Sequence, residues 1–394
     1  MKKVLLVANW DWVLFNFRFA LAKTLKREGY DVVLVCPEGS YIERMKSEGF
    51  RWVDWSLQRR SLNPVNELKS ISTLANIYRE EAPDLIHHDT IKPNFYGSMA
   101  VRLNRWRASN ALNPRVINTF MGLGYLFSNH PKATLLRRSL LPVIRFALDQ
   151  PGLFTIFSNQ RDRQTFISQN LLSEDKTQVL VSECVNISAF RPSLDEASTT
   201  DRPLRVLMAA RLLWDKGVQE FVDASRILQA RGHKVEFLLA GLPDKENPQW
   251  VPEENLRAWE SEGLIQWLGH RSDMPELLQQ VDISILPTHY NEGLPRFLVE
   301  SASAGLPLIA TDIPACKRIV RDDINGIIIP TQDPASLAGA VERLLLSKSL
   351  RQEMSAASRK IAVEEFDENQ ILRQWQGMYD KLVNDEEVPV PQAS

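Results

Sequence analysis

The sequence predicts an α/β protein built from two doubly wound domains. Short β-branched runs alternate with helical patterns along the chain, which indicates parallel sheets. The runs are continuously apolar, as expected of strands that are buried on both faces. The alternation is interrupted once, by the polar stretch 195–203, which is typical of a linker. With 394 residues, the chain is long enough for two domains with separate cores.

The first half is expected to contain six parallel strands, each followed by a helix. Its opening apolar run ends at Asn9 and Asp11, so it is interpreted as a first strand rather than a signal peptide. The six expected strands are Val4–Ala8, Val32–Cys36, Leu85–His88, Val116–Phe120, Phe154–Ser158 and Val179–Ser182.

The second half repeats this pattern and then ends in helices. Helical patterns over Ala335–Leu346 and Leu350–Glu364 precede a last one over Glu368–Val383, which is expected to pack back across the first domain. The expected strands are Leu204–Ala209, Val235–Gly241, Ile265–Leu268, Ile283–Pro287, Leu308–Thr311 and Ile327–Pro330.

These patterns divide the chain into four parts. We expect Rossmann-like domains over 1–183 and 184–366, a returning C-terminal helix over 367–385, and a disordered tail over 386–394. In doubly wound folds, ligands bind beyond the carboxyl ends of the strands, where the strand order reverses. With two such domains, a cleft between them is the natural place for a site.

The net charge of −2 conceals a basic first half and an acidic second half. Residues 1–182 contain 25 Lys and Arg against 16 Asp and Glu, whereas residues 183–394 contain 22 against 33. The basic half indicates an anionic partner, such as nucleic acid, a phospholipid surface or a phosphorylated substrate. The alternative is a chance distribution of solvated surface charge.

Several function classes are excluded by what the sequence lacks. Gly122 and Gly124 begin a dinucleotide-binding pattern whose third glycine is missing, and no P-loop is present. Three widely spaced cysteines indicate a reduced protein without a disulfide framework. The best apolar run, Leu140–Leu148, is far shorter than the about 20 residues needed to span a bilayer and is broken by Arg145.

The strongest group of candidate residues lies in the second half. Arg211 and Lys216 follow a strand, and two such cations can stabilise a departing diphosphate without a metal ion. A helix that opens near Pro295, with proline at its first position, would add backbone N–H groups. Glu292 and Glu300 can accept hydrogen bonds from sugar and ribose hydroxyls. Taken singly, these residues could equally be solvated surface charges.

These segments resemble the retaining family 4 glycosyltransferases of GT-B fold. The hallmarks are an A-R-L-x-x-x-K-G segment, here Ala210–Gly217, and an E-x(7)-E segment, here Glu292–Glu300. A further set resembles bacterial enzymes that add a sugar, often an N-acetylhexosamine, to undecaprenyl-diphosphate-linked acceptors in O-antigen, capsule or glycoprotein-glycan assembly. That set is Arg60–Pro64, Lys92–Gly97, Gly122–Phe127 and Leu268–Asp273.

The resemblance implies a fold, an activity and residue roles. It implies GT-B architecture, a nucleotide-sugar-binding second domain, and catalytic roles for Arg211 and Lys216 on the donor diphosphate. Glu292 would bind the transferred sugar, and transfer would retain the anomeric configuration by front-face attack. The other implied donor-binding residues are Gly269 and Arg271 beside the base, Gly293 and Leu294 through backbone N–H groups, and Glu300 at the ribose.

The first domain is expected to bind the acceptor. Asp89, Lys92, Gly122 and Gly124 are assigned to this side. Where many relatives carry a glycine-rich turn after the first strand, this chain has Asn9–Trp12. No cofactor is expected, because the UDP-sugar is a co-substrate.

His87, His88 and Asp89 close a strand, so His87 and Asp89 should share one face and His88 the other. Two histidines and a carboxylate suggest a metal site, but no fourth ligand is apparent nearby. We therefore expect hydrogen-bonded structural histidines and no metal.

Two segments of the basic half combine cations with apolar residues. Arg102–Arg107 and Leu135–Phe146 are typical of segments that lie at a membrane interface. Peripheral association with the cytoplasmic face of an anionic membrane is expected, because the lipid-linked acceptor that the resemblance implies would require it. The alternative is an ordinary amphipathic helix packed on the core, which Pro142 would break or kink.

The sequence thus predicts a metal-independent retaining glycosyltransferase that uses a UDP-sugar donor and a lipid-linked acceptor. Three alternatives remain open: a family 4 enzyme with a soluble acceptor, a nucleotide-sugar 2-epimerase, and a non-catalytic basic protein that binds RNA or membranes. Nucleic acid is not expected as a partner, because the sequence contains no RNA-binding signature.

Overall fold

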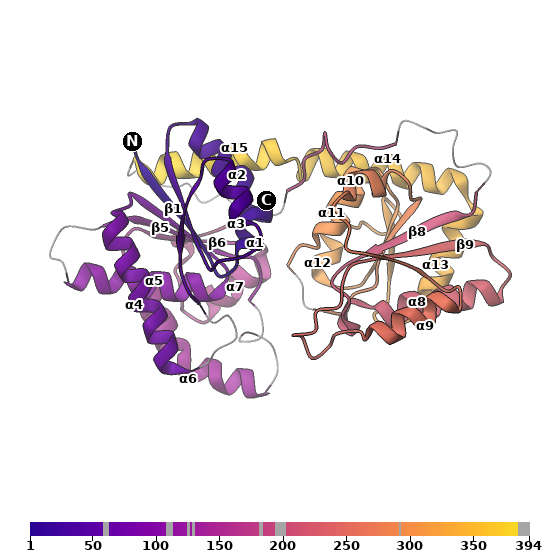
Figure 1. Ribbon diagram of the computed structural model, residues 1–394, viewed down its shortest axis with the longest axis horizontal. Helices are drawn as coiled ribbons and strands as arrows, with labels where there is room; N and C mark the ends of the chain where they lie inside the picture. Colours follow the sequence, from indigo (N-terminus) through magenta and orange to yellow (C-terminus); the bar gives the residue numbers. More distant parts are fainter. Residues whose placement is uncertain are drawn as a thin grey trace. The chain divides into compact units, whose positions relative to one another are not determined.

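The protein is described by a computed structural model covering residues 1–57, 63–107, 113–123, 127, 131–180, 184–193, 202–290 and 293–384. The chain forms two compact units. Unit 1 comprises Met1–Ser182 and Gln370–Ser394, and unit 2 comprises Glu183–Asn369. Figure 1 shows a twisted sheet with helices on both faces in each unit. The expected tail over 386–394 lies outside the described residues.

Unit 1 is built on a seven-stranded parallel sheet. Its strands are β1 (Lys3–Ala8), β2 (Asp31–Cys36), β3 (Arg51–Asp54), β4 (Leu85–Asp89), β5 (Arg115–Phe120), β6 (Leu153–Phe157) and β7 (Thr177–Val179). They lie in the order β3-β2-β1-β4-β5-β6-β7. Five of the six expected strands are confirmed to within one residue at each end, whereas the expected strand Val179–Ser182 shares only Val179 with β7. The prediction missed β3, an edge strand whose charged ends Arg51 and Asp54 are exposed.

Helices cover both faces of this sheet. Their bounds are α1 (Asp11–Val13), α2 (Phe19–Arg27), α3 (Ile42–Ser47), α4 (Pro64–Glu81), α5 (Ile91–Arg107), α6 (Pro131–Leu148), α7 (Gln160–Ser168) and α15 (Glu368–Val383). Tyr78 of α4 bonds to His88 and Tyr379 of α15 bonds to the preceding His87. Because successive strand residues point to opposite faces, α4 and α15 lie on opposite sides of the sheet.

The core of unit 1 forms because the strands are apolar on both faces. Leu5, Val33 and Ile86 of the sheet pack with Leu74 and Tyr78 of α4, all nearly or fully buried. Burying each large apolar side chain contributes roughly 1.5–3 kcal/mol. α4 is started by Asn63, which accepts a hydrogen bond from the backbone N–H of Val65 at 3.0 Å.

A π-helical segment, Leu14–Arg18, interrupts the helical stretch after β1. Such segments are rare and occur often at functional sites. Here the segment ends at Arg18, whose guanidinium reaches the carboxylate of Asp89 at the end of β4.

Unit 2 is built on a six-stranded parallel sheet. Its strands are β8 (Leu204–Ala209), β9 (Val235–Ala240), β10 (Gln266–Gly269), β11 (Ile283–Leu286), β12 (Leu308–Thr311) and β13 (Gly326–Ile329). They lie in the order β10-β9-β8-β11-β12-β13. All six strands expected in this half are confirmed, within one residue at each end.

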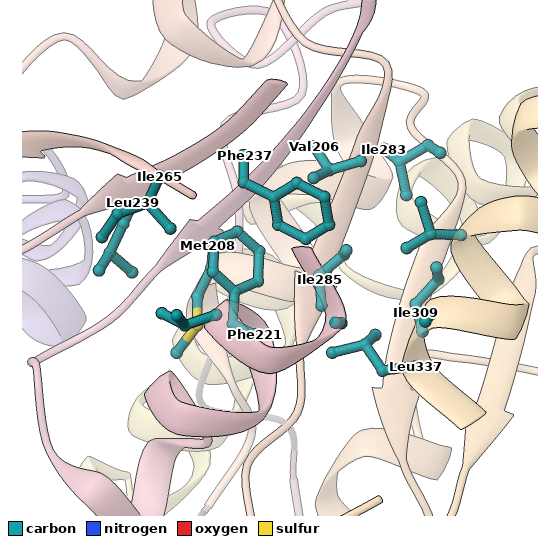
Figure 2. Close-up of a cluster of buried hydrophobic side chains, with 14 of the residues drawn as sticks. Val206, Met208, Phe221, Phe237, Leu239, Ile265, Ile283, Ile285, Ile309 and Leu337 are labelled. Atoms are coloured by element: carbon teal, nitrogen blue, oxygen red, sulfur yellow. The ribbon is translucent and has the colours of Figure 1, made fainter. Parts of the chain in front are cut away.

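The helices of unit 2 also form two layers. Their bounds are α8 (Val218–Ala230), α9 (Glu253–Ser261), α10 (Met274–Leu278), α11 (Arg296–Ser303), α12 (Pro314–Lys317), α13 (Pro334–Leu346) and α14 (Lys348–Glu365). α8 packs against α13, and α11 packs against α14. Figure 2 shows the core where Phe221 of α8 and Leu337 of α13 meet Met208, Phe237 and Ile285 of the sheet.

The last helix, α15, returns to unit 1 as predicted. The indole ring of Trp375 in this helix stacks on the imidazole of His87 with ring centroids 5.0 Å apart, and Tyr379 is fully buried beside it. The phenol of Tyr30 donates a hydrogen bond to Asp380 at 2.7 Å. The C-terminal segment is therefore part of the unit 1 core. Within the described ranges, we find no helix with the length and apolar character that crossing a bilayer requires.

Candidate active site

Each sheet reverses its strand order at one point. In unit 1 the reversal lies at β1, between β2 and β4, and in unit 2 it lies at β8, between β9 and β11. Ligands of doubly wound proteins bind beyond the carboxyl ends of the strands at this point. The residues that follow β1, β4, β8 and β11 are therefore the candidate ligand-binding residues.

In unit 2, the loops that follow β8 and β11 are joined at Asp215. Its carbonyl oxygen accepts hydrogen bonds from the backbone N–H groups of His289 at 3.0 Å and Tyr290 at 3.1 Å. It also accepts one from the hydroxyl of Thr288 at 3.2 Å. The ammonium of Lys216 lies 5.0 Å from the ring centroid of Tyr290, and the residue is only 8% exposed. The loops that follow β8 and β11 therefore meet at one place on the edge of the sheet.

Gly217 makes the close approach of these loops possible. Its backbone has φ +83°, and a Cβ there would run into the backbone carbonyl of Pro287 at the end of β11. Only glycine satisfies both conditions without strain. The Lys-Gly pair of the sequence motif thus has a backbone reason: the glycine allows α8 to start close to β11, directly after Lys216.

Arg211 lies on the other side of β8. Its guanidinium pairs with the carboxylate of Asp244, which follows β9, at 3.1 Å, and its side chain is 48% exposed. The backbone N–H of Leu212 donates to the carbonyl of Leu242 at 3.0 Å, which holds the two loops together. The structure therefore brings Lys216, but not Arg211, to the loop after β11, and both cations lie at the carboxyl edge of the sheet beside the reversal point.

Glu300 lies on α11, which the loop after β11 leads into. The helix begins at Arg296, so Pro295 is its N-cap and not its first residue as expected. The Arg296 guanidinium donates to the Glu300 carboxylate at 2.6 Å. Burial raises the pKa of Glu300, and Arg296 acts in the opposite direction. Gly293 and the buried Leu294 precede the helix, and Glu292 lies outside the described residues.

The segment expected beside the base follows β10. Gly269 has φ +65°, and its carbonyl accepts the N–H of Gly241 at 2.7 Å. Arg271 is held by its neighbour Asp273, with Nε to Oδ1 at 2.7 Å. Both residues lie at the same edge of the sheet as Lys216, because all strands of this sheet are parallel.

Sequence reasoning assigned no role to His289 or Tyr290. His289 Nε2 lies 3.5 Å from the Asp215 carboxylate, and its Nδ1 is buried with no hydrogen-bond partner among the described residues. Their place in the loop before Glu292 was the available signal. A separate hollow of about 770 Å³ beside β12 and β13 is lined by none of the donor-side residues named above.

In unit 1 the reversal point is filled by a buried ion pair. Arg18 Nε lies 2.9 and 3.1 Å from the two carboxylate oxygens of Asp89, and Arg18 Nη2 lies 2.7 Å from Oδ1. The guanidinium also lies 4.7 Å from the ring centroid of Trp375. Burial raises the pKa of Asp89, and Arg18 opposes this shift.

This environment differs from the one expected for Asp89. We expected its carboxylate to line an acceptor site, but the residue is fully buried and its carboxylate is engaged by Arg18. Sequence reasoning missed Arg18, because the pair joins positions 71 residues apart. No local spacing signals such a contact.

The two histidines of β4 point to opposite faces, as predicted. His87 contacts Tyr379 through Nδ1 at 2.5 Å and Thr119 through Nε2 at 2.7 Å. His88 contacts Tyr78 and Asn118, both at 2.8 Å. Burial lowers the pKa of His87 well below its usual value and that of His88 to about 4. In the part of the chain that the structure describes, no group of three His, Cys, Asp or Glu residues is arranged to hold a metal ion.

The remaining acceptor-side residues lie at the same edge of unit 1. Lys92, on the first turn of α5, donates to both carboxylate oxygens of Glu67 at 3.1 Å. Gly122 follows β5 with φ +136°. Gly124 lies outside the described residues.

Comparisons with known proteins agree with this architecture. The model of the family "Glycosyl transferase 4-like" matches residues 3–160, and that of "Glycosyl transferases group 1" matches residues 191–361. A relative from Campylobacter jejuni, N,N'-diacetylbacillosaminyl-diphospho-undecaprenol alpha-1,3-N-acetylgalactosaminyltransferase, is 28% identical over 94% of this chain and 96% of its own. The UDP-Gal:alpha-D-GlcNAc-diphosphoundecaprenol alpha-1,3-galactosyltransferase of Escherichia coli is 23% identical over 83% of each chain.

Solved structures share the fold over nearly the whole chain. A glycosyltransferase from Rickettsia africae superposes with a TM-score of 0.78 at 19% identity, covering 98% of this chain and 99% of that one. Anabaena Alr3699/HepE in complex with UDP superposes with a TM-score of 0.75 at 17% identity, covering 97% and 100%. The chain therefore belongs to the glycosyltransferases of GT-B fold, with a glycosyl transferase 4-like first domain and a group 1 second domain.

Proposed function

We propose that this chain is a metal-independent, retaining glycosyltransferase. It transfers an N-acetylhexosamine from a UDP-sugar to an undecaprenyl-diphosphate-linked saccharide at the cytoplasmic face of the membrane, in the assembly of a bacterial surface polysaccharide or glycan. The observation that carries the proposal is the joined pair of loops at the reversal point of unit 2, which holds Lys216 beside Tyr290.

The charge at this edge suits a nucleoside diphosphate. Lys216 lies on one side of β8 and Arg211 on the other, so the carboxyl end of that strand is flanked by two cations. Negative charge develops on the diphosphate as it departs, and cations already in place stabilise it without reorganisation. The N-terminus of α11 adds backbone N–H groups for the same anion.

The remaining donor residues take the roles that the sequence motif implies. Glu292 binds the transferred sugar, and Glu300 accepts hydrogen bonds from the ribose hydroxyls. Gly293 and Leu294 donate backbone N–H groups. Gly269, the last residue of β10, and Arg271, which follows that strand, lie beside the base.

The transfer proceeds on one face of the donor sugar. The bond from the anomeric carbon to the phosphate oxygen breaks while the bond from that carbon to the acceptor oxygen forms. The departing phosphate oxygen takes the acceptor's proton, so the products are UDP and a glycoside of retained configuration. Lys216 and Arg211 stabilise the UDP anion during this step.

The acceptor is proposed from the relatives and from charge. The names of the Campylobacter jejuni and Escherichia coli relatives both specify substrates linked to diphospho-undecaprenol. A diphosphate on a membrane-bound lipid presents negative charge, which suits the basic half of this chain.

A surface of α5 and α6 suits contact with the membrane that carries such an acceptor. Trp106, Val143 and Phe146 are 84%, 51% and 55% exposed. The guanidinium of Arg102 lies 4.2 Å from the ring centroid of Phe146, and Arg145 is exposed beside it. Aromatic and aliphatic groups next to cations bind the interface of an anionic bilayer, where each cation gains about 1 kcal/mol.

Helix α6 also contributes to the core of unit 1. Packing on the core and contact with the membrane, the two interpretations of this segment, thus concern different faces of one helix. Ile144 and Leu148 are buried in a cluster with Phe120 and Phe166, while Val143 and Phe146 face outward. Pro142 lies inside α6 without ending it, so of the expected break or kink the break does not occur.

The enzymatic test uses purified protein, UDP-GalNAc or UDP-GlcNAc, and a lipid-diphosphate-linked saccharide in the presence of EDTA. We expect a glycosylated lipid whose new linkage is α, as shown by the coupling constant of its anomeric proton. A strict requirement for a divalent metal, or a β linkage, would contradict the proposal. Equal turnover of the free saccharide without its lipid would favour a soluble acceptor instead.

The membrane contact is tested separately with vesicles. Co-sedimentation should be strong with phosphatidylglycerol, weak with phosphatidylcholine, and reduced by added salt. The double variant Trp106→Ser/Phe146→Ser should bind less without losing turnover of a detergent-solubilised acceptor. Equal binding of the variant and the parent would assign the contact to another surface.

A further inference from the structure

Unit 1 contains a cavity of about 420 Å³ at the carboxyl ends of β2 and β3. Its lining comes from the residues after β2, the end of β3 and the segment after it, and the first half of α4. The volume lies within the range of roughly 300–1,000 Å³ that is typical of small-ligand pockets. The cavity lies at the ligand-binding edge of the sheet, but none of the residues assigned to the acceptor lines it.

The lining is rich in oxygen atoms that can bond to hydroxyl groups. Carboxylates are supplied by Glu38, Asp54 and Glu67, and hydroxyls by Ser56, Ser70 and Thr73. Lys69 is the only cation among the lining residues that the structure describes. Within the described lining, the three carboxylates outnumber Lys69 and the Lys92 that pairs with Glu67, so these residues suit an uncharged ligand better than a diphosphate. The same groups accept hydrogen bonds from the hydroxyl and amide N–H groups of an uncharged sugar.

Glu67 is held in a fixed position from outside the cavity. Lys92 donates to both of its oxygens at 3.1 Å, and the hydroxyl of Tyr96, one turn further along α5, donates to Oε2. The Lys92 and Glu67 side chains are each 16% exposed. A carboxylate held by two donors on another helix loses little side-chain entropy when it binds a ligand.

We propose that this cavity binds the saccharide part of the acceptor, and that Lys92 acts as a positioning residue through Glu67. The inference rests on the proposed function and names the subsite for its acceptor. The lipid diphosphate lies outside the cavity, and the acidic lining selects the neutral sugar. Pro37 and Leu57, which also line the cavity, offer apolar contact to an acetyl group or a sugar ring.

The first experiment measures steady-state kinetics of the Glu67→Gln variant of the full chain. The loss of a charged hydrogen-bond acceptor should raise the KM for the lipid-linked acceptor by about 10-fold to 100-fold. The KM for the UDP-sugar, and the slow hydrolysis of the UDP-sugar without acceptor, should stay within about 2-fold of the parent enzyme. Lys92→Met should raise the same acceptor KM by a smaller factor.

The matched control is Glu80→Gln, at the exposed far end of α4. It makes the same chemical change on the same helix and should leave every constant unchanged. An unchanged acceptor KM in Glu67→Gln would overturn the proposal. Equal losses in acceptor turnover and donor hydrolysis would also overturn it, because they would show a general structural defect.

A second experiment separates this inference from the proposed function. Saturation-transfer NMR with the methyl glycoside of an N-acetylhexosamine should show binding to the parent chain. Thr73→Trp, which fills the cavity, should abolish that signal while UDP still binds. Absence of the signal in the parent chain, or its persistence in Thr73→Trp, overturns the cavity assignment. Failure of lipid-acceptor turnover with an intact NMR result would instead reject only the acceptor named in the proposed function.

Discussion

The two units share one strand order over six strands, to which unit 1 adds β7, but they use their reversal points differently. In unit 1, the ends of β1 and β4 are closed by Arg18, Asp89 and Trp375, all almost fully buried. In unit 2, the ends of β8 and β11 carry Lys216 and Tyr290, with the half-exposed Arg211 across the strand. The comparison teaches that a doubly wound sheet provides an edge, and that side chains decide whether this edge holds a ligand or the protein's own core.

The origin of the difference is the C-terminal helix. α15 brings Trp375 and Tyr379 onto the face of β4 that carries His87. This cover excludes water from the Arg18–Asp89 pair, and a buried pair is costly to break on one side only. In the described part of unit 2, α8 and α11 begin directly after the loops that follow β8 and β11, so their first residues lie at the carboxyl edge of the sheet.

The largest effect is expected from breaking the ion pair of unit 1. Arg18→Met leaves the Asp89 carboxylate buried without its partner, which should destabilise unit 1 by about 3–5 kcal/mol. Hydrogen exchange followed by mass spectrometry reports each unit separately and should show faster exchange in unit 1 peptides only.

The control for this prediction is the double variant Arg18→Met/Asp89→Leu. It replaces both charges with apolar groups and should recover most of the loss. Unchanged exchange in the single variant, or a double variant that exchanges as fast as the single one, would show that the pair does not support unit 1.

Removal of the cations of unit 2 should instead affect catalysis. Lys216→Ala and Arg211→Ala should each lower kcat by about 10²–10³-fold, which is the effect of losing one preorganised group that stabilises charge. Unit 1 and unit 2 should exchange at parental rates. Lys245→Ala, which removes an exposed lysine paired with Glu253, is the matched control. Parental kcat in both active-site variants would remove them from the site.

The third prediction concerns pH. Folded His88 stays neutral down to its pKa of about 4, whereas an unfolded histidine takes a proton near pH 6.5. The unfolded state therefore binds more protons between these values, and unit 1 should lose about 3 kcal/mol from this group as the pH falls from 6.5 to 4. Asp89, whose pKa is raised, acts in the opposite direction.

The variant His88→Gln isolates this contribution. The stability of unit 1, measured by hydrogen exchange across the same pH range, should depend less on pH in the variant than in the parent. Parallel pH profiles for the two proteins would show that His88 does not titrate as its burial implies.

The smallest effects are expected at helix caps. Asn159 caps α7 in unit 1 by accepting the N–H of Asp162 at 2.8 Å, and Ser347 caps α14 in unit 2 by accepting that of Leu350 at 3.3 Å. Alanine at either position should cost about 1 kcal/mol. Each substitution should speed exchange only in its own unit, and a change in both units would show that the units unfold together.

Much of the fold could be predicted because it depends on local patterns. The apolar runs predicted eleven strands to within one residue at each end, and the helical pattern over Glu368–Val383 matches α15 at both ends. β3 was not predicted, because an edge strand with exposed charged ends lacks a continuous apolar run. The start of α11 differs from the prediction by one position, so that Pro295 is the N-cap rather than the first residue. Helix ends are set by backbone hydrogen bonds that composition does not specify.

The site was only partly predictable. The position of Lys216 and its loop could be predicted, because residues that follow a parallel strand lie at the carboxyl edge of the sheet. The engagement of Asp89 by Arg18 and of Lys92 by Glu67 could not, because both contacts join distant positions and depend on packing. The cavity beside Glu67 could not be predicted either, because its lining comes from three separate segments of the chain.

The central claim is that the cations at the carboxyl edge of unit 2 bind the donor diphosphate. Isothermal titration of the full chain with UDP and with uridine, both in EDTA, tests it most directly. Lys216→Ala should weaken UDP binding by about 10-fold to 100-fold and leave uridine binding unchanged, because only UDP carries the charge that Lys216 meets. Unchanged UDP affinity, or equal weakening of UDP and uridine, would contradict the account.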